Sequence, residues 1–199
     1  MKLFSFIEPA DANLSTYSHR LYELLLRAST EFEANARAVL TANGYLKKGR
    51  WNIFDYAKLE PACRLSAFAT ALPVWRGSAS VRRPFSVWAK NLSVSLPWYT
   101  DYNSVKHDRP MEFEKATLGN VIDAVSGVFI ILFAQFHTVV CNPYGNLIFY
   151  STTPSGGLTH PNSFFQINLP SWEPDNSYDF EWKKLRATTD PIAKYPFAP

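Results

Sequence analysis

Apolar side chains recur at intervals of three and four residues near the start of the chain, which is the spacing of one face of an α-helix. They are Leu14, Tyr17, Leu21, Leu24, Leu25, Ala28, Phe32, Ala36, Val39 and Leu40. This pattern predicts a long amphipathic helix over residues 14–40. Asn13 or Ser15 is expected to cap its start, and Asn43 with Gly44 is expected to end it.

A second long helix is predicted over residues 110–136. Asp108 is a candidate N-cap, Pro110 suits the first helical turn, and an apolar run follows. The most apolar part, residues 124–136, is shorter than the roughly 20 residues that span a membrane, and Asp123 stands at its edge. We therefore expect a buried helix and no association with a membrane.

Three residues of this helix leave alternatives open. Asp123 fits a half-buried position paired with a cation as well as an exposed position on the helix surface. Ser126 and Gly127 allow another element to approach closely, either at a dimer interface or inside the core of one subunit.

The other segments favour shorter elements. Four prolines interrupt residues 45–97, so long helices are not expected there. Residues 138–141 and 147–150 flank a segment with Pro and Gly, which predicts a β-hairpin. Residues 151–199 are rich in proline and aromatic residues, and we expect a loop-like tail that packs back on the helices.

These elements predict a mainly α-helical fold in a single domain over residues 1–199. Residues 14–136 would form the helical core, and residues 137–199 the short hairpin and the extended, packed C-terminal tail. The chain of 199 residues, with 47% hydrophobic and 19% charged residues, is long enough for one sizeable core.

Composition narrows the classes of function. The net charge of +3 is too small to identify a nucleic-acid binder, so a phosphate ligand would need a local cluster of cations. Cys63 and Cys141 are far apart and, even with His137, supply too few ligands for a zinc site, so no metal or other cofactor is expected. Reduced thiols and an N-terminal segment unlike a signal peptide indicate a cytoplasmic protein.

The residues best suited to chemistry stand just before the second predicted helix. His107 and Arg109 would lie beside its N-terminus, where backbone N–H groups and the helix dipole bind phosphate, and Lys106 would add a charge. Metal-independent RNA cleavage needs a group that removes the 2′-hydroxyl proton, a group that protonates the leaving oxygen, and a cation beside the phosphate. A histidine with a nearby arginine or lysine meets these needs.

The alternative is a purely structural role for the same segment. Asn103 and His107 would then tie a helix junction together by hydrogen bonds, while Lys106 and Arg109 would be solvated surface charges. On the first helix, His19 is predicted to lie on the surface or in helix packing. Glu31 and Glu33 are two residues apart, hence on different sides of that helix, and are given no chemical role.

A longer part of the sequence resembles a known family. The first helix with residues 24–33, the later stretch of residues 102–107 and the apolar helix after it resemble the HEPN superfamily of helical domains, over residues 14–136. Members carry an Arg, often followed by a polar residue such as Asn, and a His a few positions later. Many are metal-independent ribonucleases that assemble this site across a homodimer. The resemblance implies a HEPN-like helical bundle in which Asn103 matches the polar residue and His107 the histidine.

The chain departs from the family motif at one position. Tyr102 stands five residues before His107, where the family pattern has Arg. Arg109 or Lys106 is then the candidate cation for the phosphate, and Asn103 the residue that orients the site. Tyr102 is a candidate to stack on a base or to hydrogen-bond a phosphate oxygen.

Two hypotheses of function follow. In the first, the protein is a homodimeric, HEPN-like binder of RNA or another phosphate ligand, and an active site would make it a metal-independent endoribonuclease with His107 as general acid or base. A role in a toxin or defence system follows only by family analogy. In the second, it is a non-catalytic interaction or scaffolding subunit whose apolar second helix and aromatic tail pack against a protein partner or a second copy of the chain. Tyr102 in place of Arg favours the second hypothesis.

Overall fold

The computed structural model describes residues 2–136, 140–141, 147–148, 151–152, 158–159 and 165–168, together with residues 195 and 197. The protein is mainly helical, as predicted, with small antiparallel sheets. The helices are α1 (His19–Ala42), α2 (Ile53–Tyr56), α3 (Glu60–Cys63), α4 (Pro97–His107), α5 (Arg109–Glu112) and α6 (Leu118–Phe136). The strands are β1 (Ala69–Ala71), β2 (Val81–Arg82), β3 (Val140–Cys141), β4 (Leu147–Ile148), β5 (Ser151–Thr152), β6 (Leu158–Thr159) and β7 (Gln166–Asn168).

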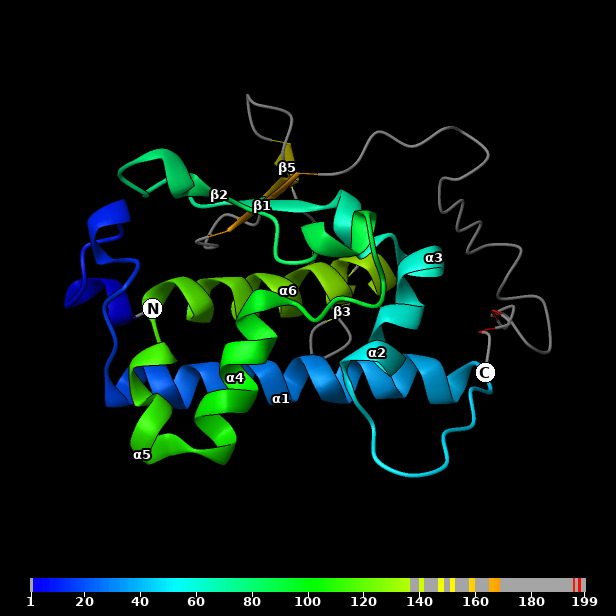
Figure 1. Cartoon of the computed structure of the whole chain (residues 1–199). Helices are drawn as coiled ribbons and strands as arrows, with labels where there is room; N and C mark the ends of the chain where they lie inside the picture. Colours follow the sequence, from blue (N-terminus) through cyan, green and yellow to red (C-terminus); the bar gives the residue numbers. More distant parts are fainter. Residues whose placement is uncertain are drawn as a thin grey trace.

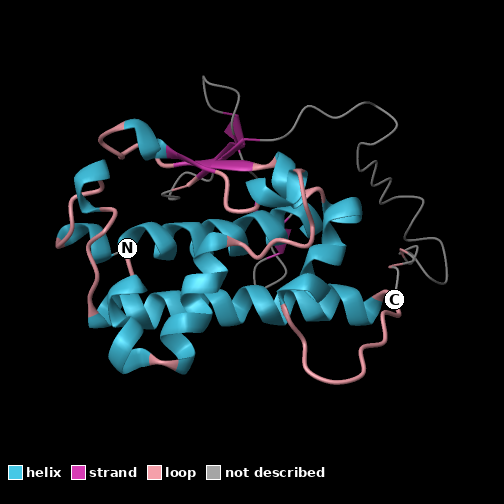
Figure 2. Ribbon diagram, viewed as in Figure 1, coloured by secondary structure: helices cyan, strands magenta, loops and turns pink. Residues whose placement is uncertain are grey.

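Helices α1 and α6 form the centre of the fold. They run side by side in the same direction, and α4 packs across both (Figure 1). Backbone hydrogen bonds join their N-terminal ends, from Leu118 N to Thr16 O at 2.8 Å and from Gly119 N to Leu14 O at 2.9 Å. An antiparallel sheet with the strand order β2-β1-β7-β6-β5 lies over the face of α6 turned away from α1 (Figure 2).

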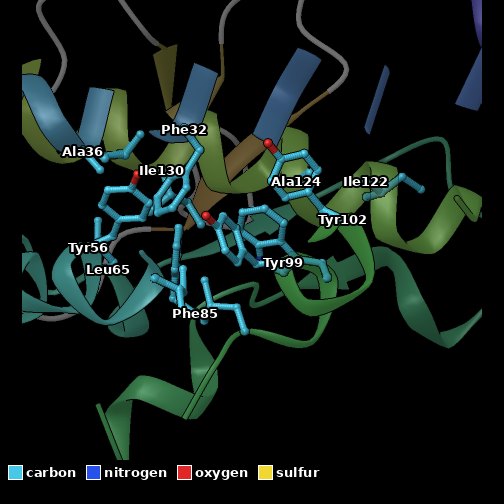
Figure 3. Packing of buried hydrophobic residues seen from close by; sticks show 14 of the residues in the cluster. Phe32, Ala36, Tyr56, Leu65, Phe85, Tyr99, Tyr102, Ile122, Ala124 and Ile130 are labelled. Carbon is cyan, nitrogen blue, oxygen red and sulfur yellow. The ribbon is translucent and has the colours of Figure 1, made fainter. Parts of the chain in front are cut away.

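Buried aromatic side chains fill the space between α1, α2 and α4 (Figure 3). Phe32 of α1 stands at the centre, with its ring centroid 5.9 Å from that of Tyr56, 5.6 Å from Phe85 and 5.5 Å from Trp98. Full burial of one such side chain contributes about 1.5–3 kcal/mol to folding. The cluster therefore holds α4 firmly against α1, which fixes the positions of the side chains that these two helices present.

Contacts within the core decide the alternatives that the sequence left open for α6. The Asp123 carboxylate is paired with Arg82, with Nε 2.7 Å from Oδ1 and Nη2 2.6 Å from Oδ2. The buried Ser126 Oγ accepts a hydrogen bond from Thr70 Oγ1 at 2.8 Å. A Cβ atom on Gly127 would meet an aromatic ring of the core at 3.3 Å. The close approach at Ser126 and Gly127 thus lies inside the core of the chain.

Helix α1 begins later than the pattern predicts. It starts at His19 with Ser18 as its N-cap, so the prediction of Asn13 or Ser15 is wrong. The Ser18 Oγ accepts a hydrogen bond from the backbone N–H of Leu21 at 3.2 Å. The residues before Ser18 stay outside the helix because their carbonyl groups bind the start of α6.

Helix α6 begins at Leu118, so the prediction of one helix starting at Pro110 is also wrong. The preceding stretch forms the short α5 and a single 3₁₀ turn, Phe113–Lys115. Ala116 then has a ψ of 54°, which interrupts the helical path. Thr117 restarts it as a cap, because its Oγ1 accepts a hydrogen bond from the backbone N–H three residues later at 3.2 Å.

The apolar character of α6 is that of a core helix. Within the described part of the chain, it is the one helix long and apolar enough to cross a membrane, over residues 118–135, but 56% of that stretch is buried inside the fold. It contacts α1, α4 and strands β1 and β2 of the sheet. The prediction of a buried helix is confirmed.

Strands β3 and β4 pair as the predicted hairpin. Val140 lies opposite Ile148 and Cys141 opposite Leu147, in an antiparallel register. The turn between them lies outside the described residues.

The described parts of the C-terminal segment include strands. β5, β6 and β7 fall where a loop-like tail was predicted, so that prediction is wrong for these residues. Ile167 of β7 is fully buried in the core, and the backbone N–H of Tyr195 donates to Asn43 Oδ1, at the end of α1, at 2.8 Å. The prediction that the rest of the tail packs on the helices concerns residues outside the described part.

Candidate functional site

Helix α4 carries most of the predicted site residues. Pro97 occupies its first turn, and Trp98, Tyr99, Tyr102 and Val105 form its buried face. The sequence interpretation placed this segment before a helix N-terminus, but the segment is itself a helix and His107 is its last residue. A helix C-terminus presents carbonyl groups and the negative end of the dipole. Phosphate binding here would therefore depend on side-chain cations and not on a helix N-terminus.

A pocket of about 420 Å³ opens beside the C-terminal half of α4. We refer to it as the α1–α4 pocket. Its lining residues come from α1, from the loop after α1, from α2 and from α4, and they are Glu33, Arg37, Arg50, Trp51, Tyr56, Tyr99, Asn103, Lys106 and His107. Residues 33–37, 50–56 and 99–107 thus contribute cations, an amide, an imidazole and aromatic rings to one concave surface.

Three cations give the pocket its charge. The Arg37 Nε donates to the backbone carbonyl of Glu33 at 3.2 Å, which fixes the side chain along α1 and leaves the terminal guanidinium nitrogens for a ligand. Arg50 is exposed, and its side chain has no hydrogen-bond partner among the described residues. Lys106 Nζ donates to the Tyr102 hydroxyl at 2.8 Å. Against these three cations the described lining contains one carboxylate, Glu33.

Lys106 remains a cation at neutral pH. Partial burial lowers the pKa of its ammonium group, but the hydrogen bond to Tyr102 and the charge of Glu33 outweigh this effect, so that the net shift is upward. Lys106 is therefore suited to neutralising phosphate charge and not to accepting a proton.

The aromatic residues form one wall of the pocket. The half-buried Trp51 stacks on Tyr56, with ring centroids 6.3 Å apart and planes at 12°, and Tyr56 meets Tyr99 edge to face at 6.4 Å. Figure 3 places both tyrosines in the aromatic cluster of the core. Burial, together with the charge of Glu33, raises the pKa of Tyr56, and burial with the hydrogen bond to Glu33 raises the pKa of Tyr99. Both hydroxyl groups therefore stay protonated.

The pocket brings together three of the five predicted site residues. Asn103, Lys106 and His107 line it, and among the described residues Asn103 and His107 have no hydrogen-bond partner for their side chains. Tyr102 does not line it, because this residue is fully buried and its ring packs on that of Tyr99 with centroids 5.3 Å apart. The ring of Tyr102 is therefore not open to a base, and its hydroxyl serves to position Lys106.

Arg109 lies outside the pocket, in a separate group of side chains. Its Nη2 is 3.0 Å from His19 Nδ1, and its guanidinium lies 4.6 Å from the ring centroid of Tyr22 and 5.6 Å from that of Phe113. We refer to these four residues as the Arg109 cluster. His19 also packs on Phe113, with ring centroids 4.8 Å apart, which agrees with the predicted role in helix packing.

Sequence reasoning missed the contributions of α1 and of the loop after it. Arg37 and Glu33 fit an ordinary i,i+4 pair on a helix surface, and Glu33 was given no chemical role. Arg50 had no distinguishing neighbour in the sequence. A local signal existed only for α4, where Pro97 suits a first helical turn and buried positions follow at helical spacing.

The fold and the pocket together define a mainly helical protein with a cation-rich, aromatic-walled surface site. Comparisons of the chain with known protein families, with curated proteins and with solved structures give no match. Across the part of the chain that the structure describes, no three His, Cys, Asp or Glu side chains gather in an arrangement that holds a metal ion.

Proposed function

We propose that the protein binds RNA, or another phosphate-bearing ligand, in the α1–α4 pocket. The observation that carries this proposal is the meeting of Arg37, Arg50 and Lys106 with Asn103 and His107 in one pocket. Clustered cations neutralise phosphate oxygens, and an unpaired amide can orient the ligand. The half-buried Trp51 in the lining supplies an aromatic ring for contact with a base.

A HEPN-like cleavage activity extends the proposal. His107 would act as the general acid or base on the ribose and the leaving oxygen, with Asn103 orienting the phosphate. Arg37 and Arg50 would take the role of the family arginine, whose position is occupied here by Tyr102, because they line the same pocket as His107. We also propose that the protein is cytoplasmic and that it forms a homodimer, as many members of the family that the sequence resembles do.

The binding part is tested with Arg37→Gln. The affinity for a short unstructured RNA, measured by fluorescence anisotropy in excess EDTA, should fall on the order of tenfold, the effect of one lost charge-assisted hydrogen bond. The matched control is Arg27→Gln, an exposed arginine on the same helix that does not line the pocket. Equal affinities of the wild type and both variants would contradict binding in this pocket.

The catalytic part is tested by RNA cleavage in EDTA. The His107→Ala variant, with folding confirmed by circular dichroism, should lose at least about 100-fold in cleavage rate, the usual contribution of a general acid or base. Cleavage that persists in His107→Ala would contradict the assigned role. Binding without cleavage by the wild type would restrict the proposal to a binding site.

A specific observation also favours the second candidate, a non-catalytic interaction subunit. The position where the family has Arg is occupied by a tyrosine that is 0% exposed and packed on Tyr99. This position therefore belongs to the core, and no cation stands there. A protein that neither binds nor cleaves RNA but co-purifies with a stoichiometric partner would support this candidate.

A further inference from the structure

Glu33 stands in a pocket otherwise lined by cations and uncharged groups. Among the described lining residues it is the only acid. A carboxylate beside a bound phosphate is repelled by it, which lowers the affinity for the ligand that the cations attract. A ligand that also offers a hydrogen-bond donor would turn this unfavourable neighbour into a favourable contact.

The carboxylate is held in place by α4. The Tyr99 hydroxyl donates to Glu33 Oε1 at 2.7 Å. Tyr99 is only 4% exposed, and its ring is packed between Trp98 at 5.7 Å and Tyr102 at 5.3 Å. Because the Tyr99 hydroxyl stays protonated, it donates permanently to this oxygen. The second oxygen of Glu33, Oε2, has no partner among the described residues, so the pocket lining contains a positioned carboxylate with an unused acceptor.

The chemistry of nucleic acids limits which donor can meet this acceptor. Phosphate oxygens only accept hydrogen bonds, and the donors on the bases vary with sequence. The ribose 2′-hydroxyl is a donor that stands next to the phosphate in every RNA nucleotide and is absent from DNA. Cations that hold a phosphate therefore bring the 2′-hydroxyl of the same nucleotide to a neighbouring group.

We propose that Glu33 accepts a hydrogen bond from a ribose 2′-hydroxyl and so makes the α1–α4 pocket selective for RNA over DNA. This inference rests on the proposed binding of a phosphate-bearing ligand at the same site. With DNA, the carboxylate stays unpaired beside the phosphate, so discrimination arises from a repulsive contact as well as from a missing hydrogen bond.

The experiment measures the binding of RNA, DNA and 2′-O-methyl RNA of one sequence in EDTA. Both proteins compared carry His107→Ala, and one of them also carries Glu33→Ala. The protein that retains Glu33 should bind RNA on the order of tenfold tighter than DNA, the effect of one hydrogen bond to a charged group. The 2′-O-methyl RNA should bind as weakly as DNA. Glu33→Ala should bring the ratio close to one, mainly by strengthening the binding of DNA.

Two further variants keep the test sharp. Glu33→Gln keeps a hydrogen-bond partner for the Tyr99 hydroxyl and replaces the alanine variant if that variant folds poorly. Its preference for RNA over DNA should lie between that of the protein with Glu33 and that of Glu33→Ala. Glu31→Ala removes an exposed carboxylate two residues away on α1, outside the pocket, and should leave the ratio unchanged.

The outcomes separate this inference from the function on which it rests. An RNA to DNA ratio that stays the same in Glu33→Ala and Glu33→Gln would overturn the role of Glu33, while RNA binding that depends on Arg37 would still stand. If the wild type binds none of the three oligonucleotides, the proposed function fails and this inference fails with it.

Discussion

The α1–α4 pocket and the Arg109 cluster contain the same kinds of side chain, yet they differ in what those side chains contact. In the Arg109 cluster, the guanidinium meets His19 Nδ1 and lies against two aromatic rings. In the pocket, Arg50, Asn103 and His107 have no hydrogen-bond partner among the described residues. Unused hydrogen-bond donors, and not residue types, therefore distinguish a candidate binding site from a structural contact.

Arg82, outside both regions, is an arginine whose contacts serve the fold alone. Both guanidinium contacts of Arg82 go to Asp123, and the two side chains are only 19% and 21% exposed. This pair joins β2 to α6, so its groups are committed to the fold. The three cationic sites therefore form a series from a fully paired arginine, through the stacked Arg109, to the open Arg50.

The largest effect is expected from Arg82→Ala. Loss of the bidentate pair leaves the half-buried Asp123 carboxylate without its partner, and stability should fall by about 2 kcal/mol, the range for hydrogen bonds to charged groups. Urea denaturation measures this change in the free energy of unfolding. RNA affinity of the folded variant should stay at the wild-type value. If Arg82→Ala is as stable as the wild type, the pair of Arg82 and Asp123 does not stabilise the fold, and the prediction is wrong.

The sequence predicted the existence of the long helices better than their starts. The helical spacing of apolar residues in α1 and the apolar run of α6 both reflect burial in the core, and both patterns can be recognised in the sequence. The starts depend on tertiary contacts, because the carbonyl groups of Leu14 and Thr16 bind the first residues of α6 and not the next turn of α1. No local pattern of residues reports such a contact.

The candidate site was predictable only where it is local. Asn103, Lys106 and His107 are close in sequence and fall on one side of α4, so a single segment indicated them. Arg50 and Glu33 join them only because the aromatic cluster around Phe32 packs α4 on α1. The burial of Tyr102 was not predicted for the same reason, since it depends on this packing and not on the residues beside it in sequence.

A smaller effect is expected from Arg50→Gln, and it should appear in binding instead of stability. RNA affinity should fall about fivefold, and the slope of log affinity against log salt should decrease by about 0.7, the value for one phosphate contact with a single strand. Stability should stay within about 0.5 kcal/mol of the wild type, as for most exposed substitutions. Lys48→Gln, in the same loop but outside the pocket, is the matched control. A decrease in salt slope that is equal in both variants would point to a diffuse charge effect.

The smallest effect is expected from Arg109→Gln, although sequence reasoning placed Arg109 in the site. The residue is exposed, and its contacts with His19, Tyr22 and Phe113 occur near solvent, where such interactions contribute little. Stability should fall by no more than about 0.5 kcal/mol, and RNA affinity should change less than about twofold, because a cation outside the pocket acts on the ligand only through screened charge. Parallel anisotropy titrations of Arg109→Gln and Arg50→Gln at one salt concentration make the contrast direct. If Arg109→Gln weakened RNA binding as strongly as Arg50→Gln, the ligand would have to extend from the pocket to the Arg109 cluster, and the distinction between paired and open cations would no longer define the site.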